Sequence, residues 1–128
     1  MLVALEMFEW NVVFEFKTTN AYFRDTIIYI HIIMKLVKIV PSTNPKKKLE
    51  AHFLLDNGKS KIVRFGATGY EDFTIHKDEK RKELYLDRHR EVEDWNNPLT
   101  AGALSRWILW NKPTIRGSVI DFKRKFGL

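Results

Sequence analysis

The stretch LEAHFLLDNGKSKIVRFG, Leu49–Gly66, has the pattern of two β-strands joined by a tight turn. Apolar residues alternate along its first half and would share one strand face: Leu49, Ala51, Phe53 and Leu55. Asp56–Gly58 predicts the turn, because Asn-Gly readily adopts the positive φ angles that hairpins need. The chain then returns as Lys61–Gly66, with Val63 and Phe65 on one face. The sequence therefore predicts a β-hairpin at the centre of the fold.

One further strand precedes the hairpin, and a helix follows it. KLVKIV (Lys35–Val40) has the composition of a strand, which Pro41 ends. FGATGYEDFTIH (Phe65–His76) then predicts a loop, and we expect Tyr70, Phe73 and Ile75 to fix this loop to the core. The charged segment His76–Arg90 predicts a helix whose narrow apolar stripe lies around Leu84 and Tyr85.

Two more helices are expected toward the C-terminus. Asn97 as the N-cap and Pro98 at the first helical position start one, which runs to about Trp110. The other spans Thr114–Phe126, and Gly127 suits its C-terminal cap. Its apolar residues recur at helical spacing and predict a single buried stripe: Ile115, Val119, Phe122 and Phe126.

This order of elements predicts an α+β fold, with a small antiparallel sheet that contains a β-hairpin, followed by three helices packed on one side. The helix expected over residues 97–110 is apolar on most of its surface, which is typical of a central helix. We therefore expect Trp107 to be a core residue. Arg106 and Trp110 form a candidate interface instead, since Trp and Arg are common in binding surfaces.

Residues 1–33 differ in composition from the rest of the chain. They contain neither Gly nor Pro and have a net charge of −2, whereas residues 34–128 have a net charge of +8. A chain that begins MKLVKIVPS at Met34 would look complete. We therefore expect translation to start at Met34, with 1–33 as an upstream extension and 34–128 as a single basic α+β domain. The alternative is that 1–33 supplies extra strands, at Asn11–Phe16 and Thr26–Ile33.

The sequence contains no motif typical of an enzyme or a metal site. Cysteine is absent, which excludes thiolate ligands and nucleophiles, and the four histidines follow no metal-binding spacing. FGATGY lacks the Lys-Ser/Thr pair of a phosphate-binding P-loop. The acidic run Glu91–Asp94 is contiguous, whereas a metal-dependent nuclease needs carboxylates from separate elements. We therefore expect no catalytic residues, no metal and no cofactor.

Basic residues are the strongest functional signal. The net charge of +6 favours polyanionic partners such as nucleic acid. The basic residues of the last helix and of the loop Pro41–Lys48 have few acidic neighbours, so they are candidates for phosphate contacts. The predicted nucleic-acid-binding residues are Lys46, Lys47, Lys48, Lys112, Arg116, Lys123, Arg124 and Lys125. The alternative interpretation is a basic surface that only keeps the protein solvated.

FGATGYEDFTIHKDEKRKELYLDRH, followed by WNNPLTAGALSRWILWNKPTIRGSVIDFKRKF, resembles an uncharacterised family of small proteins from nucleocytoplasmic large DNA viruses. The resemblance covers about Leu49–Phe126, and SRWILWNKPT is its most specific piece. It implies a viral protein of the host cytoplasm or nucleus that is packaged in the virion, and it supplies no site residues. It does not extend to residues 1–33, in line with a start at Met34.

These observations lead to two functional hypotheses. The first is a small basic viral protein, not an enzyme, that binds DNA or RNA weakly through backbone contacts without sequence preference. The second is a virion structural or assembly protein that binds other virion proteins. No membrane span is expected, because the apolar run Thr26–Met34 has only about half of the ~20 residues that a span needs.

Overall fold

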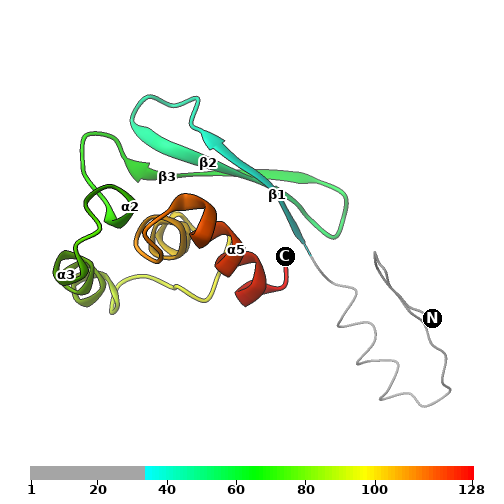
Figure 1. Ribbon diagram of the computed structural model, residues 1–128. Coiled ribbons are helices and arrows are strands. Elements are labelled where there is room, and N and C mark those ends of the chain that lie inside the picture. The colour runs from blue at the N-terminus through cyan, green and yellow to red at the C-terminus, as the bar shows by residue number, and fades with distance from the viewer. Residues whose placement is uncertain (1–33) are drawn as a thin grey trace, which may run out of the picture. The chain divides into compact units, whose positions relative to one another are not determined.

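The computed structural model of the protein describes residues 34–128, which Figure 1 draws in colour. The predictions for residues 1–33, an upstream extension or extra strands at Asn11–Phe16 and Thr26–Ile33, lie outside the described residues. From residue 34 onward, the chain forms a three-stranded antiparallel sheet followed by helices. The predicted α+β fold class is confirmed.

The sheet has three strands, whose spatial order is their order in the sequence: β1 (Lys35–Pro41), β2 (Lys47–Leu54) and β3 (Ser60–Ala67). β2 and β3 form the predicted hairpin, in which Ala51 pairs with Val63. Gly58 in the turn has a φ angle of +83°, the positive value that Asn-Gly predicts. The alternating pattern therefore gave the pairing of these strands correctly.

One face of the sheet packs against the helices and contributes to the core. Leu36, Ala51, Phe53 and Phe65 on this face are almost completely buried. The register of β1 against β2 shifts just after Leu36. This β-bulge leaves Val37 56% exposed at the outer strand of the sheet.

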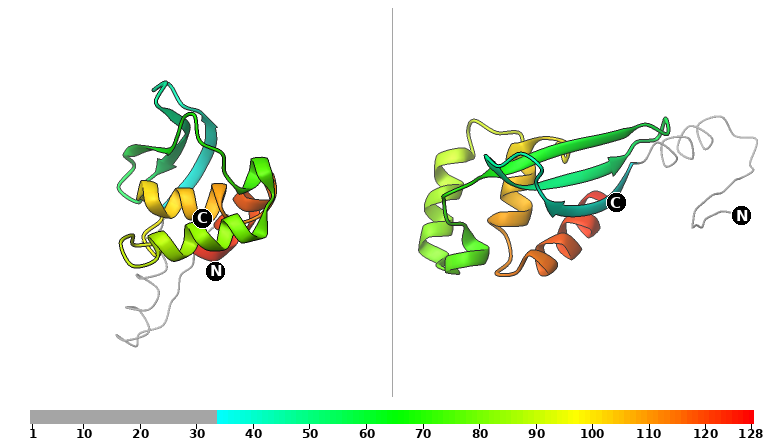
Figure 2. Two further views of the ribbon diagram at one scale, coloured as in Figure 1. Left: turned by 90° about the vertical axis from the view of Figure 1, so that its left-hand side faces the viewer. Right: turned by 90° about the horizontal axis from the view of Figure 1, so that it is seen from above.

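The helices lie on one side of the sheet, as Figures 1 and 2 show. In chain order they are α2 (Phe73–His76), α3 (Glu79–His89), α4 (Ala101–Leu104), η1 (Ser105–Leu109) and α5 (Ile115–Phe126). α4 and η1 follow one another directly, and η1 is a wider π turn, in which the Trp110 N–H donates to the Ser105 carbonyl. The three predicted helices correspond to α3, α4–η1 and α5, and α2 is an additional single turn.

The predicted start of the second helix is wrong. α4 begins after Thr100 instead of at Pro98, because the Thr100 hydroxyl accepts the N–H of Ala103 at 3.1 Å and caps the helix. The Asn97 side chain accepts the N–H of Leu99 at 3.0 Å. Asn97 therefore closes a separate turn before the helix.

The buried stripe of α5 differs from the predicted one. Ser118 and Phe122 are completely buried, whereas Ile115 is 39% exposed. Ser118 can lie inside because its hydroxyl accepts the N–H of Lys112 at 3.0 Å. The core therefore follows the Ser118–Phe122 line, and Ile115 lies at its margin.

The prediction that Trp107 is a core residue is also wrong. The fully buried residues of its helix are Ala103, Leu104 and Ile108, while Trp107 keeps part of its surface exposed. Its indole N–H donates to the Trp95 carbonyl at 2.8 Å. The Arg106 guanidinium lies 4.1 Å from its ring centre, so Trp107 covers the core at its edge.

Candidate functional site

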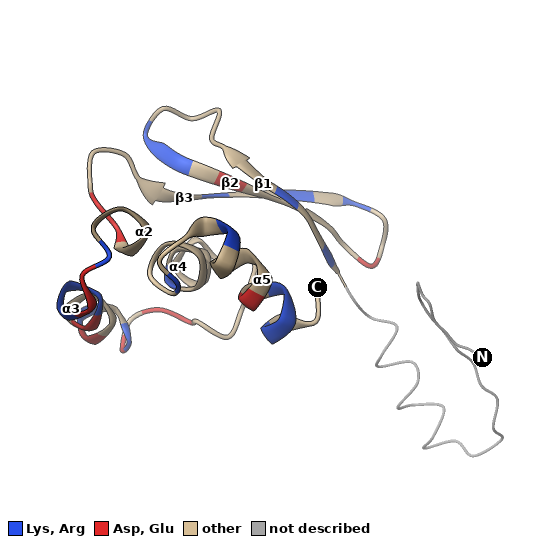
Figure 3. Ribbon diagram, in the orientation of Figure 1, with Lys and Arg blue, Asp and Glu red and all other residues tan. Residues whose placement is uncertain are grey.

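The eight predicted nucleic-acid-binding residues fall into separate places. Lys46–Lys48 lie in the β1–β2 loop and at the start of β2. Lys112 and Arg116 lie around the start of α5, and Lys123–Lys125 lie in its last turn. Figure 3 shows the basic start of β2 and the basic end of α5 in different parts of the domain. The structure does not bring the predicted residues into one surface.

Two of these eight cations have carboxylate partners. Lys48 Nζ lies 2.6 Å from Asp72 Oδ2, and Arg124 Nη1 lies 3.3 Å from Asp121 Oδ1. Lys125 Nζ lies 4.4 Å from the ring centre of Trp107. Among residues 34–128, no carboxylate lies within ion-pair distance of the others: Lys46, Lys47, Lys112, Arg116 and Lys123.

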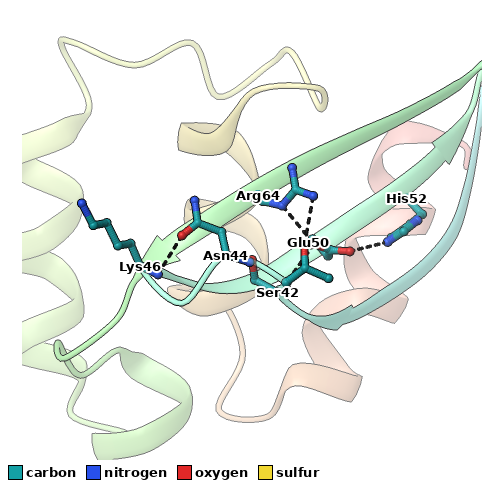
Figure 4. Close-up of polar contacts among 7 residues, drawn as sticks. Ser42, Asn44, Lys46, Glu50, His52 and Arg64 are labelled. Carbon is teal, nitrogen blue, oxygen red and sulfur yellow. Dashed lines mark hydrogen bonds and ion pairs between the residues drawn. The ribbon is translucent and has the colours of Figure 1, made fainter.

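Glu50 holds the β1–β2 loop against the outer face of the sheet, as Figure 4 shows. Its carboxylate accepts the N–H and the hydroxyl of Thr43, both at 3.1 Å, and the Nε–H of Arg64 at 3.1 Å. His52 Nε2 lies 2.8 Å from the same carboxylate. The Thr43 N–H, and then His52, lower the pKa of Glu50 to about 2. A buried anion thus fixes the loop that carries Lys46.

A groove of about 600 Å³ lies between the start of the hairpin, α3 and α4–η1. Residues far apart in the sequence form its walls, among them Lys47, Tyr70, Arg81, Leu84, Arg88 and Trp110. Tyr70 and Ile75 are 73% and 57% exposed, so the prediction that these two fix their loop to the core is wrong. For Phe73, which is 2% exposed, the same prediction is confirmed. The groove therefore joins the predicted cations of β2 to cations of α3 and to Trp110.

Four aromatic rings lie in contact beside α3, and three of them are stacked. Tyr85 lies parallel to Trp110, with ring centres 4.1 Å apart, and His89 stacks on Tyr85 at 4.0 Å. His76 lies against Trp110 at 5.4 Å. Burial, and then the nearby Glu93 carboxylate, raise the pKa of Tyr85. We call these four rings the aromatic column; three of them, Trp110, Tyr85 and His89, line the groove.

The rim of the groove has an excess of positive charge. Arg81 Nη1 lies 2.9 Å from Glu71 Oε1, and Lys48 is paired with Asp72. Lys47 and Arg88 have no carboxylate partner among the described residues. These two side chains are therefore the cations of the rim that remain available to an anion.

Arg106, predicted as part of an interface, does not line the groove. Its guanidinium lies between the rings of Trp107 and Trp95, at 4.1 and 5.3 Å, and donates to the Trp110 carbonyl at 3.1 Å. Burial, and then the charge of Arg90, lower its pKa. Of the two predicted interface residues, the groove contains only Trp110.

A second, smaller groove of about 340 Å³ lies between β1 and α5. Its lining includes three exposed apolar side chains, Val37, Ile115 and Ile120. Three cations border them: Lys38, Arg116 and Lys123. This groove places Arg116 and Lys123 beside apolar surface.

Residues 37–89 match the sequence model of a family of unknown function (DUF5754). The matched segment runs from β1 to the end of α3, so it includes Lys47, Tyr70, Arg81 and Arg88 of the groove. Comparisons with curated proteins and with solved structures gave no match. The likeness to this family therefore adds no activity to the geometry of the site.

The described part of the chain, residues 34–128, offers neither a membrane-spanning helix nor a cluster of metal ligands. None of the helices in this part of the chain has the length and apolar character needed to cross a membrane. No three His, Asp or Glu side chains in the same residues gather closely enough to hold a metal ion.

Sequence reasoning missed several residues of the groove. Arg81 and Arg88 belong to the charged segment His76–Arg90, in which acidic and basic residues alternate closely, but their spacing of seven residues places them on one helical face. That spacing is the signal that could have found them. Tyr70 was missed because an aromatic residue beside a core residue, Phe73, resembles a core residue itself.

Proposed function

We propose that the protein binds nucleic acid through phosphate contacts, without catalysis, and that the rim of the 600 Å³ groove is the main contact surface. The observation that carries this proposal is the pair of cations, Lys47 and Arg88, that face the groove without carboxylate partners in the described domain. Cations of this kind release counterions from nucleic acid when they meet phosphates, which favours binding.

The binding should be weak and independent of sequence. Lys47 and Arg88, with Lys46 next to Lys47 in the chain and Arg81 released from its exposed pair with Glu71, offer three or four phosphate contacts. Contacts of this number support micromolar or weaker affinity near physiological salt. Phosphate contacts alone do not distinguish bases.

The end of α5 is the less favourable surface. Lys123–Lys125 lie in the last helical turn, where cations interact favourably with the helix dipole. Arg124 is paired with Asp121, and Lys125 lies on Trp107. The helix dipole, Asp121 and Trp107 therefore already stabilise the positive charges of Lys123–Lys125, and no ligand is needed to explain them.

The viral setting is proposed on the resemblance of SRWILWNKPT and its flanks alone. In that setting the protein would act in the host cytoplasm or nucleus and would be packaged with the nucleic acid that it binds.

Fluorescence anisotropy with labelled DNA and RNA at low salt tests this proposal. A Lys47→Glu/Arg88→Glu double variant should lose at least tenfold in affinity, because it replaces two phosphate contacts with repulsion. The matched control is Lys112→Glu/Arg116→Glu, which changes the net charge equally and should lose much less. An equal loss in both variants would contradict the groove as the contact surface.

A virion structural or assembly protein is the second candidate function. The groove between β1 and α5 favours it, because exposed Val37 and Ile120 lie beside Lys38 and Lys123, which suits a protein partner with apolar and acidic side chains. This function would replace the first if the protein bound neither DNA nor RNA at low salt. It would then form a stoichiometric complex with a capsid protein, which an Ile120→Asp change would weaken.

A further inference from the structure

We propose that the groove selects single-stranded over duplex nucleic acid, with one unpaired base lying against Tyr70 and the His89 end of the aromatic column. This inference rests on the nucleic-acid binding proposed above and names its substrate class.

The size and shape of the groove are the first argument. Its volume, about 600 Å³, is within the ~300–1,000 Å³ typical of sites that enclose a small molecule. A duplex keeps its bases stacked inside a convex cylinder, so only its phosphates could touch the rim. A single strand can turn a base out of its stack and place it in a concave site.

Tyr70 is the second argument. It lies in the loop between β3 and α2, lines the groove and is 73% exposed. Isolated exposed apolar residues are ordinary, but this one lines a concave surface that Arg81 and Lys47 also line. An aromatic ring next to cations is the arrangement by which proteins bind single strands, since bases stack on the ring and phosphates meet the cations.

The aromatic column lines the groove with rings that are already held in place. Tyr85 already has a ring on each face, Trp110 at 4.1 Å and His89 at 4.0 Å, so it offers no free face itself. His89 ends the column, and its Nδ1 is fixed by the Tyr85 carbonyl at 2.8 Å. A ring that is already held in place loses little freedom when a base stacks on it.

The positions of Lys47 and Arg88 also suit a single strand that crosses the groove. Lys47 belongs to β2 and Arg88 to α3, so they border the groove from two different elements. A strand that crosses the groove could place phosphates near both while a base between them points inward. A single base contact of this kind needs no particular base, because every base has a stacking face.

The test uses a single-stranded DNA of about 12 nucleotides, a length within the range that single-strand sites cover. The same sequence is also prepared as a single-stranded RNA and as a hairpin duplex. Anisotropy gives the affinities of the full chain for each. A copy of the single strand with 2-aminopurine reports stacking through loss of its fluorescence. The variants are Tyr70→Ala, Tyr70→Phe and, as a control for loss of an exposed apolar side chain, Ile75→Ala, since Ile75 is 57% exposed and does not line the groove.

We expect the parent to bind the single strand at least tenfold more tightly than the duplex and to quench 2-aminopurine. Tyr70→Ala should lose about tenfold in single-strand affinity, the effect of one stacked base, while Tyr70→Phe and Ile75→Ala keep it. The DNA and RNA strands show which sugar is preferred. Equal binding of duplex and single strand, unchanged in Tyr70→Ala, would overturn this inference and leave phosphate binding intact. No binding of either form would overturn both.

Discussion

Glu50 and Asp72 are buried carboxylates that hold the loops next to the groove. Both are at most 3% exposed, and a buried charge is costly unless it is paired and hydrogen-bonded. Asp72 meets this need by accepting the Thr74 N–H at 2.9 Å, which caps α2, and by pairing with Lys48 at 2.6 Å. Each carboxylate therefore fixes a segment that would otherwise be a free surface loop.

The pKa of Glu50 predicts how stability depends on pH. Because its pKa falls from an ordinary value of 4.5 to about 2 in the folded protein, its stabilising contribution is complete above pH 4.5 and is lost as the pH falls toward 2. Glu50→Gln should therefore lower the melting temperature at pH 7, and the difference from the parent should shrink between pH 4.5 and pH 2. Melting followed by circular dichroism measures this. Glu83→Gln, exposed on α3, is the control; a Glu50→Gln difference that stayed constant with pH would contradict the assignment.

Gly66 lines the groove at a position where the backbone conformation favours glycine. Its φ angle is +80°, and a Cβ atom there would lie 2.8 Å from Leu109 Cδ1. Gly66→Ala should destabilise the fold by about 2–4 kcal/mol, the sum of backbone strain and overpacking. Gly69→Ala separates the two effects, since Gly69 also has a positive φ of +92° but no atom within 4 Å. It should cost only about 1–2 kcal/mol. Urea unfolding measures the free energy of unfolding of both variants. Equal losses would show that the Leu109 side chain moves aside at no cost and would contradict the overpacking.

At the scale of elements, the sequence predicted those with regular spacing. Alternation gave the hairpin of β2 and β3, and helical spacing gave α3 and α5. It did not give α2, because a four-residue helix depends on the Asp72 cap and not on periodicity. Nor did it give the π turn of η1, since a single wider turn leaves no repeat in the pattern. That turn lies at Trp107, whose burial was predicted wrongly.

The last turn of α5 should be sensitive to charge reversal for structural reasons. A Lys123→Glu/Lys125→Glu variant would place anions at the negative end of the helix dipole and remove the Lys125–Trp107 contact. We expect a loss of about 1–2 kcal/mol in the free energy of unfolding. Lys46→Glu/Lys47→Glu, exposed residues at the other end of the domain, should change it by less than about 0.5 kcal/mol. Urea unfolding of the two variants would contradict this if their losses were equal.

At the scale of the whole molecule, the groove arises only when distant segments meet. Lys47, Tyr70, Arg88 and Trp110 come from four separate segments of the chain. The side chain of Lys82 links two of these segments by donating to the Asn111 carbonyl at 2.8 Å. The sequence supplied the basic character and one flank of the site, Lys46–Lys48, but no spacing along the chain shows that α3 faces the start of the hairpin.

A chain of residues 34–128 alone should fold cooperatively. This segment contains its own core, in which Phe53 and Phe65 of the sheet and Leu104, Ile108 and Phe122 of the helices are fully buried. Thermal unfolding of 34–128 should show a single transition near that of the full chain. A broad transition without cooperativity would show that residues 1–33 are needed for folding.

The most direct test of the central claim is the salt dependence of binding to a labelled single strand. With three or four phosphate contacts, the logarithm of the association constant should fall linearly with the logarithm of salt concentration, with a slope of about −2 to −3. In the Lys47→Glu/Arg88→Glu variant the slope should be smaller in magnitude by about one to one and a half. A parent protein that shows no binding at low salt, or whose slope the double variant leaves unchanged, would contradict nucleic-acid binding at the groove.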